Sequence, residues 1–255
     1  MRFRPRVIPV LLLSDGGLVK STGFTDPRYL GDPINIVRIF NEKGVDELVL
    51  LDIDAGRLRT PADIELLAEI ASEAFVPLAV GGGIETVDEI RTLLGLGFEK
   101  VVLCSVTVER PEFVAHAAAT FATSSIVVCI DVKRGRFGRR EVMTRGGQVR
   151  HKLDPVEHAI NVARLGAGEI IVQSVDRDGS MAGYDLELVE DIADAVDVPV
   201  IALGGAGSVD DFDAALRRGA AAAAAGSTFV FQGRHRAVLV TYPTDDELGG
   251  LTHAN

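Results

Sequence analysis

"GVDELVLLDID" (residues 44–54) returns 122 positions later as "GAGEIIVQSVD" (residues 166–176). The same offset carries "VPLAVGGG" (76–83) onto "VPVIALGG" (198–205), and it carries Ser105 onto Ser227. A match in constant register over about 60 residues indicates a structural repeat rather than chance similarity of two generic segments. The chain is therefore predicted to consist of two similar halves.

Short apolar runs recur along all 255 residues, and most of them are followed by a Gly, Ser or Asp turn and a helical pattern. The predicted strands lie near 7–12, 47–53, 76–80, 100–104, 125–131, 169–174, 198–203 and 221–226, with clear helical patterns at 86–97 and 185–196. Strands that are apolar on consecutive residues are typical of a parallel sheet covered on both faces. The sequence thus predicts the α/β class and a single (βα)8 TIM barrel with a two-fold half-barrel repeat.

The remaining segments are assigned by composition. The barrel is expected over residues 1–243, with rim loops at 56–65 and 133–154, the second carrying a small hairpin. A last helix is predicted at 233–242, ended by Pro243, and residues 244–255 are expected to form a disordered tail.

The beginning of the chain resembles a secretory signal, because three arginines precede the apolar run 7–13. Seven apolar residues are at the short limit of a signal core, and Ser14 and Asp15 follow where a small-residue cleavage site would be needed. No stretch approaches the roughly 18 apolar residues of a membrane span. We therefore expect a cytoplasmic protein without a membrane partner.

Composition excludes several other classes of protein. A net charge of −11 argues against nucleic-acid binding, which favours a basic face. Cys104 and Cys129 stand inside apolar runs, so buried thiols are expected rather than a disulfide. The five histidines show no paired spacing of the zinc type, and the Gly-rich "GGAGS" lacks the acidic partner of a dinucleotide fingerprint. Neither a metal nor a cofactor is predicted.

Four predicted strands end in glycines or a small hydroxyl, at "VGGGI", "LCS", "LGGAGS" and "AAGST". Exposed backbone amides at such ends can bind phosphate, and barrel enzymes place their sites at this face. Because the four ends form two pairs related by the repeat, they predict two phosphate sites. The candidate residues are Gly82, Gly83 and Ser105 for the first site, and Gly204, Gly205, Gly226, Ser227, Asp178 and Gly179 for the second. The alternative is that the glycines only permit tight strand-to-helix turns.

The fifth strand ends in "VVCIDVKR" and places Asp131 at the rim between the two predicted phosphate sites. A carboxylate there is a candidate general acid or base, or alternatively a helix N-cap. Sliding the first strand onto the fifth puts Leu12 at the position of Asp131. Only one half of the repeat therefore carries the acid.

The opposite ends of alternate strands carry charges of alternating sign, at Arg6, Glu47, Lys100 and Glu169. Alternate strands supply one layer of a barrel interior, so these four residues are expected to form a ring at the bottom. Spacing alone does not distinguish an ion-pair plug from a gate.

Together these features resemble HisF, the cyclase subunit of imidazole glycerol phosphate synthase. The resemblance covers residues 6–231 and rests on strings such as "DGGLVK", "DELVLLDI", "VGGGI", "IDVKR", "DRDG" and "GGAG". It implies a HisH-like glutaminase docked at the N-terminal face of the barrel, ammonia passing a gate of Arg6, Glu47, Lys100 and Glu169, Lys20 as a substrate-binding lysine, and Asp131 as a catalytic aspartate.

The sequence departs from that family at the second catalytic aspartate, which falls at Leu12, and at Cys104, where the family usually has a polar residue. It is more similar to a sister group, the HisF-like subunits of acetamidino-sugar modification systems, through strings such as "LLLSDGGLVK" and "GRHRAVLVTYP". Three functions follow. The first is ammonia delivery to a phosphorylated or nucleotide-linked sugar, with a further amidotransferase component; the second is the ordinary cyclase of histidine biosynthesis; the third is a non-catalytic scaffold that conducts ammonia.

Overall fold

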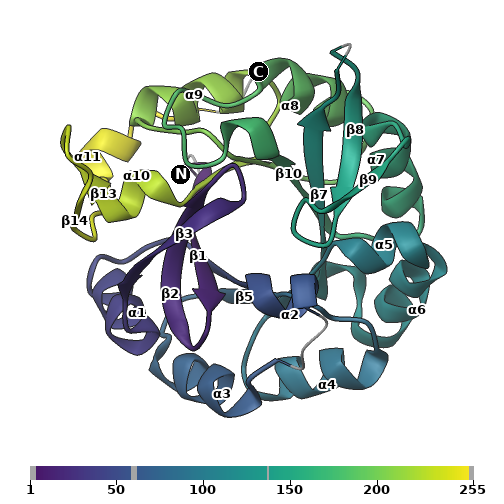
Figure 1. Ribbon diagram of the computed structural model, residues 1–255, viewed down its shortest axis with the longest axis horizontal. Helices are drawn as coiled ribbons and strands as arrows, with labels where there is room; N and C mark the ends of the chain where they lie inside the picture. The colour runs from purple at the N-terminus through teal and green to yellow at the C-terminus, as the bar shows by residue number, and fades with distance from the viewer. Residues whose placement is uncertain (1–3, 59–61, 137, 253–255) are drawn as a thin grey trace.

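Eight parallel strands close into a barrel in the computed structural model, which describes residues 4–58, 62–136 and 138–252 (Figure 1). The barrel strands are β1 (Arg6–Ser14), β4 (Leu48–Asp52), β5 (Leu78–Gly81), β6 (Lys100–Leu103), β7 (Ile126–Arg134), β10 (Glu169–Ser174), β11 (Val200–Leu203) and β12 (Ala222–Ala225). They are hydrogen-bonded in chain order, and β12 pairs with β1 to close the circle. The predicted TIM barrel is confirmed, and each predicted strand overlaps an observed one.

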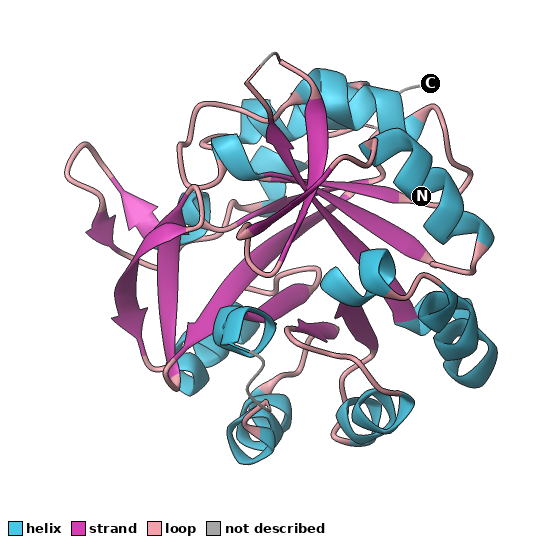
Figure 2. Ribbon diagram, turned by 45° about the vertical axis from the view of Figure 1, so that its right-hand side comes forward, coloured by secondary structure: helices cyan, strands magenta, loops and turns pink. Residues whose placement is uncertain are grey.

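The helices surround the strands, as Figure 2 shows from a second direction. They are α1 (Pro33–Glu42), α2 (Ile53–Leu58), α3 (Ile64–Glu73), α4 (Val87–Gly95), α5 (Ser105–Glu109), α6 (Glu112–Phe121), α7 (Pro155–Arg164), α8 (Leu186–Ala193), α9 (Val209–Arg217), α10 (Ser227–Val230) and α11 (Asp245–Leu248), with 3-10 turns at Thr123–Ser125 and Val175–Arg177. Among the described residues, none of the helices combines the length and apolar character that a membrane span requires.

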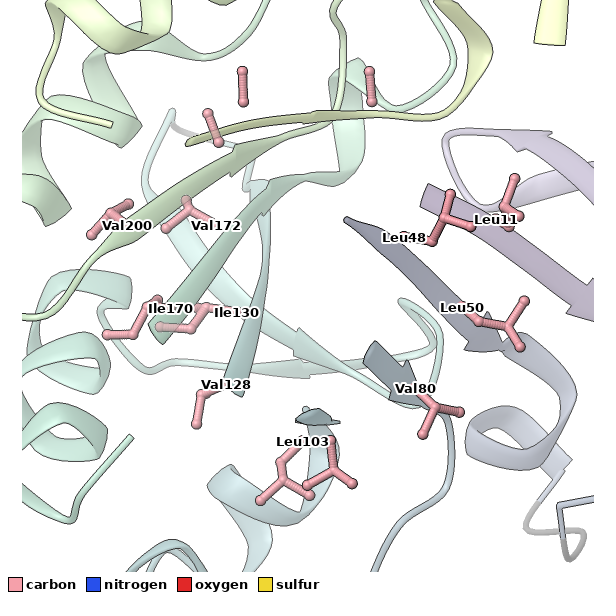
Figure 3. Packing of buried hydrophobic residues seen from close by; sticks show 14 of the residues in the cluster. Leu11, Leu48, Leu50, Val80, Leu103, Val128, Ile130, Ile170, Val172 and Val200 are labelled. Carbon is pink, nitrogen blue, oxygen red and sulfur yellow. The ribbon is translucent and has the colours of Figure 1, made fainter. Parts of the chain in front are cut away.

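The apolar core has two layers, because strand side chains alternate between the two faces of the closed sheet. The larger layer fills the space between strands and helices, and Leu50, Val80 and Leu103 point outward into it (Figure 3). The smaller layer fills the barrel interior with residues such as Ile8 and Val127. The strands are buried on both faces, which explains their consecutive apolar residues.

The repeat is visible in the helix caps. Thr86 and Glu89 form a capping box at the start of α4, and Ser208 and Asp211 form the equivalent box at the start of α9. The two boxes are related by the same offset of 122 that relates the strands. Each box satisfies free backbone N–H groups in the first turn of its helix.

Two hairpins stand on the mouth of the barrel, the face formed by the C-terminal ends of the strands. β2 (Gly17–Thr22), which carries Lys20, pairs with β1 and β3 (Thr25–Gly31), a hairpin that was not predicted from the sequence. β8 (Arg140–Thr144) pairs with β7 and β9 (Val149–His151), which confirms the hairpin expected after the fifth strand. The loop predicted at 56–65 is wrong at its ends, because α2 extends to Leu58 and α3 begins at Ile64; residues 59–61 lie outside the described chain.

The C-terminal region differs from its prediction. In place of a helix at 233–242, β13 (Phe231–Gln232) and β14 (Ala237–Val238) form a short hairpin, because Gly233 and Arg236 adopt positive φ angles that end helical geometry. Instead of the expected disordered tail, residues 245–248 form α11, and Leu248 is fully buried. Residues 253–255 of that predicted tail lie outside the described chain.

Candidate active site

A cavity of about 140 Å³ opens at the mouth of the barrel. Its walls are largely apolar, formed by Leu12, Leu51, Ile53, Ile84, Val102 and Val106. Its polar groups include Asp52, Glu85, Ser105, Asp131, Arg145 and Gln173, which come from the barrel strands, from the connections that follow them and from the turn after β8. The cavity lies where barrel enzymes place their chemistry.

Asp131 lies at the mouth, and 7% of its surface is exposed. Its two carboxylate oxygens accept hydrogen bonds from two thiols, Oδ2 from Cys104 at 3.6 Å and Oδ1 from Cys129 at 3.5 Å. Burial raises the pKa of Asp131 to about 7. Burial also raises the pKa of both thiols well above their ordinary value, so they stay protonated as donors. The carboxyl group is thus poised for proton transfer near neutral pH.

The capping alternative for Asp131 does not hold, because β7 continues past it to Arg134 and no helix begins there. The strand register also tests whether Leu12 is the first-half equivalent of Asp131. Asp131 pairs with Gln173 on β10, and Leu12 pairs with Leu51 on β4. Leu51 and Gln173 are themselves related by the offset of 122. Leu12 therefore occupies the register position of Asp131 in the first half, and both line the cavity.

The second-half end of the mouth contains a buried ion pair, in which Lys20 Nζ lies 2.8 Å from Asp178 Oδ1. Both side chains are at least nine-tenths buried, and Ser21 Oγ donates to the other oxygen of Asp178 at 3.4 Å. The methylenes of Lys20 lie against Gly226, where an added Cβ would be 3.0 Å from Cε. Beside Gly226, the buried Ser227 Oγ has no hydrogen-bond partner among the described residues. This end combines an ammonium group with an unused hydroxyl group.

The glycines of the mouth have a packing role in the structure. A Cβ at Gly82 would lie 2.3 Å from Asp52 O, and one at Gly204 would lie 2.7 Å from Ser174 O. A Cβ at Gly83 or Gly205 would similarly overlap the backbone of Ala55 or Gly183, and one at Gly179 would lie 2.5 Å from Ser21 O. Close backbone contact therefore accounts for these glycines, and their role in phosphate binding stays a prediction.

The first-half end of the mouth is organised around Arg145, in the turn between β8 and β9. Its backbone N–H donates to Ser105 Oγ at 2.9 Å. Its guanidinium group donates to Glu109 through Nε at 2.9 Å and to Glu85 through Nη1 at 3.0 Å. Ser105, one of the predicted phosphate ligands, therefore accepts a hydrogen bond from the β8–β9 turn. Arg145 was not predicted, because a lone arginine in a loop carries no periodic signal.

The four charged residues predicted at the other face form a closed ring. Arg6 donates to Glu47 at 2.5 Å and to Glu169 at 2.7 Å, and Lys100 bridges the same two carboxylates at 3.1 and 3.0 Å. The predicted ring is present across the N-terminal end of the barrel. The role of this ring as a gate for ammonia stays a prediction.

The structure brings the predicted residues together at two places, the mouth and the ring. The thiol contacts to Asp131 were missed, although the buried cysteines were predicted. Cys129 lies on the same face of β7, two residues before Asp131, so its spacing could have indicated the contact. Cys104 follows the neighbouring strand β6, so its contact depends on strand pairing. Within the described part of the chain, no group of three or more His, Cys, Asp or Glu side chains is arranged to hold a metal ion.

The chain is similar to known proteins over most of its length. The family model for "Histidine biosynthesis protein" matches residues 6–236. A Pseudomonas aeruginosa protein provisionally named imidazole glycerol phosphate synthase subunit hisF2 is 48% identical over 246 residues, covering 96% of this chain and 98% of that protein. The imidazole glycerol phosphate synthase subunit HisF of Alkaliphilus metalliredigens is 44% identical over 225 residues, covering 88% and 89% of the two chains.

Proposed function

Because the chain belongs to the histidine biosynthesis protein family and is of the HisF type, we propose that it is the ammonia-accepting subunit of a glutamine amidotransferase complex. A HisH-like glutaminase binds at the N-terminal face of the barrel and releases ammonia there. The ammonia reacts at the mouth, where Asp131 is the catalytic acid or base. The observation that carries this proposal is the ring of Arg6, Glu47, Lys100 and Glu169, which closes the barrel at the face opposite the cavity.

The interior between ring and mouth supports the transit of neutral ammonia. It is lined by apolar side chains, several of them small, such as Ala79, Ala222 and Ala224. An apolar passage disfavours the ammonium ion, because a charge loses its hydration there. The ring is closed by four ion pairs, so at least one must part for ammonia to enter. In this proposal the ring is the gate.

We further propose that the product is an acetamidino group on a sugar of a surface polysaccharide. The separate amidotransferase component transfers a phosphoryl group from a nucleoside triphosphate to the oxygen of an acetamido group. Ammonia then attacks the amide carbon, a carbon–nitrogen bond forms, and the carbon–oxygen bond breaks with release of inorganic phosphate. The absence of a second acid at Leu12 favours this reaction over imidazole ring closure. A phosphate or nucleotide on the sugar binds at the Lys20 end of the mouth, with Ser227 as a further donor.

The test is reconstitution of the barrel with its glutaminase, the amidotransferase component, a nucleoside triphosphate and the candidate sugar. The expected result is glutamine-dependent amidine formation, detected by mass spectrometry, which requires this chain. With free ammonium in place of glutamine, amidine formation that is equally fast without the barrel would contradict the proposal.

The ordinary cyclase of histidine biosynthesis is the second candidate, favoured by the names of the relatives. It requires that Asp131 alone, or a loop residue such as Asp15, replaces the missing acid. Complementation of a cyclase-deficient histidine auxotroph tests it. Growth at the ordinary rate would favour this candidate, and absence of growth would count against it.

A further inference from the structure

We propose that Thr107 and His158 are positioning residues, whose hydrogen bonds hold Cys104 in place as a thiol donor to Asp131. The inference rests on the proposed function in one respect, that Asp131 is the reacting acid or base. Neither Thr107 nor His158 lines the cavity at the mouth. Both act on Asp131 through Cys104.

The Thr107 hydroxyl group lies between a carbonyl group and a histidine ring. Thr107 is on α5, His158 is on α7, and both side chains are buried. Thr107 Oγ1 donates to the backbone carbonyl oxygen of Cys104 at 2.7 Å, and His158 Nε2 lies 3.1 Å from the same hydroxyl oxygen. A hydroxyl group has one proton to donate, and a carbonyl oxygen can only accept it. His158 Nε2 therefore carries a hydrogen and donates to Thr107.

The surroundings of His158 keep its ring uncharged. Burial, with a smaller contribution from the nearby His151, lowers the pKa of His158 to about 4. His151 Nε2 in turn lies 2.8 Å from Thr144 Oγ1 on β8, a strand that packs against both α5 and α7 (Figure 1). The donation from His158 to Thr107 is therefore constant over the pH range in which Asp131 titrates.

These hydrogen bonds fix the backbone of the residue that contacts Asp131. Cys104 immediately precedes α5, and among the described residues its side chain makes no capping hydrogen bond to that helix. Thr107 donates to the Cys104 carbonyl group through its hydroxyl group and also through its backbone N–H. With its carbonyl group held in this way, Cys104 directs its thiol to Asp131 Oδ2 at 3.6 Å. A path of hydrogen bonds thus runs from His158 through Thr107 and Cys104 to Asp131.

The repeat gives this path a counterpart in the other half of the barrel. The offset of 122 carries α1 (Pro33–Glu42) onto α7 (Pro155–Arg164) and Ser105 onto Ser227. Thr107 therefore corresponds to Phe229, and His158 corresponds to Ile36. Both counterparts are buried in the apolar layer between strands and helices.

The counterpart of the path contains no hydrogen-bonding side chain. In the order His158, Thr107, Cys104 and Asp131, the equivalent residues are Ile36, Phe229, Gly226 and, by strand register, Leu12. The fold can therefore pack these positions with apolar residues. A buried hydroxyl group and a buried imidazole are costly unless they are hydrogen-bonded. Because the polar pair occurs on the side of the barrel that carries the acid, we infer that it serves Asp131 rather than packing.

Loss of the path should change the protonation of Asp131 in a defined direction. Burial, together with the Asp178 carboxylate, raises the pKa of Asp131, whereas the hydrogen bonds from Cys129 and Cys104 lower it. A thiol donor stabilises the ionised carboxylate. When Cys104 is no longer held toward Asp131, the pKa of Asp131 should therefore rise further.

An NMR titration of the Asp131 carboxyl carbon in the full chain, assigned by comparison with Asp131→Asn, tests this. Thr107→Val removes the hydroxyl group and keeps the shape of the side chain, and the midpoint should rise by about half a pH unit. Thr107→Ser keeps the hydroxyl group and should restore the wild-type midpoint. Thr120→Val, which removes a similar hydroxyl-to-carbonyl bond on the exposed surface of α6, is the matched control and should not move the midpoint. An unchanged midpoint in Thr107→Val, or an equal rise in Thr107→Ser, would overturn the inference.

Variants of His158 test the path independently, and they decide the question if Thr107→Val does not fold. His158→Leu should raise the midpoint as Thr107→Val does. His158→Gln, whose side-chain amide can donate in place of Nε2, should leave the midpoint near that of wild type. Equal midpoints in His158→Leu and His158→Gln would remove His158 from the path.

A double-variant cycle separates positioning from a general effect on the fold. Cys104→Ala removes the thiol itself and should raise the midpoint at least as much as Thr107→Val. Because Thr107 acts through Cys104, adding Thr107→Val to Cys104→Ala should cause no further rise. An additive rise would show that Thr107 affects Asp131 by another route, and the inference would be wrong.

These NMR readouts do not depend on amidine formation. A failed reconstitution together with the expected shifts would count against the proposed reaction and not against the positioning of Asp131. Normal amidine formation together with midpoints that do not move in any variant would count against the positioning alone. In the reconstituted system, the pH at which the initial rate is half-maximal should move with the NMR midpoint from variant to variant.

Discussion

The two halves of the barrel share a backbone and differ at the strand ends. Each half has a pair of glycines after a strand, beginning at Gly82 in the first half and at Gly204 in the second. These glycines let the backbone after the preceding barrel strand approach closely. Both begin the next helix with a capping box. At the mouth, however, the first half presents Leu12 where the second presents Asp131. The repeat thus preserves the residues that fix the turns, while the residues that touch a ligand have diverged.

The same comparison explains why the two ends of the mouth differ in charge. The second half supplies Asp178, which holds Lys20 of the β2–β3 hairpin by a buried ion pair. The first half has Gly56 at the equivalent position and receives no such lysine. The first-half end of the mouth instead receives Arg145 from the β8–β9 hairpin, and this arginine is paired with Glu85 and Glu109. The two halves of the repeat therefore form a mouth whose two ends carry different charged side chains.

The largest expected effect is at Asp131. In Asp131→Asn the group that titrates near neutral pH is removed while its shape is kept, and ammonia-supported amidine formation should fall by about 10²-fold to 10⁴-fold. The measurement is the initial rate in the reconstituted system.

The matched control is Leu12→Met at the equivalent position, which keeps an apolar side chain and should leave the rate within about twofold. If Asp131→Asn retains the wild-type rate together with full glutaminase stimulation, the chain is a scaffold that conducts ammonia rather than an enzyme.

The second effect is on stability at the Lys20 end. In Asp178→Asn the ammonium group of Lys20 stays buried without its counter-charge, and the free energy of unfolding should fall by about 3 kcal/mol. Denaturant unfolding monitored by circular dichroism measures it. Glu73→Gln, which breaks the more exposed pair with Arg38, should change the same quantity by about 0.5 kcal/mol or less. Equal losses in the two variants would show that burial of the Lys20 pair has no energetic weight.

Much of this architecture follows from the sequence because the repeat and the apolar runs are local, periodic signals. The ring was also predictable, since Arg6, Glu47, Lys100 and Glu169 each stand at the beginning of a barrel strand. Arg145 and the contact of Cys104 with Asp131 were not, because they depend on how a hairpin folds over the mouth and on which strands are neighbours. The C-terminal helix was wrong for a local reason, the left-handed turn at Gly233 and Arg236.

A third effect compares the two glycine turns. Gly82→Ala should reduce the free energy of unfolding by about 2 to 3 kcal/mol, because φ is +121° and the new Cβ would overlap Asp52 O. Gly204→Ala should lose less, since its nearest contact, Ser174 O, is 2.7 Å away instead of 2.3 Å. Gly97→Ala is the control, with φ of +109° and open space around the Cβ, and should lose about 1 kcal/mol from conformation alone. Equal losses at all three would remove close packing as the reason for the glycine pairs.

The most gradual effect, spread over several pH units, is a pH dependence that only the second half should show. Burial raises the pKa of Asp131 from its ordinary range to about 7, so the folded chain holds a proton that the unfolded chain releases. The stabilisation from this proton is complete below about pH 4 and is lost as the pH rises toward 7, by about 1.4 kcal/mol per pH unit. The difference in unfolding free energy between wild type and Asp131→Asn, measured at pH 5, 6, 7 and 8, should change in favour of the variant and level off above pH 7.

Because Leu12 cannot titrate, the same series for Leu12→Met should run parallel to wild type. A flat difference for Asp131→Asn would mean that the carboxyl group is ionised throughout, and that the two thiols, rather than burial, determine its state.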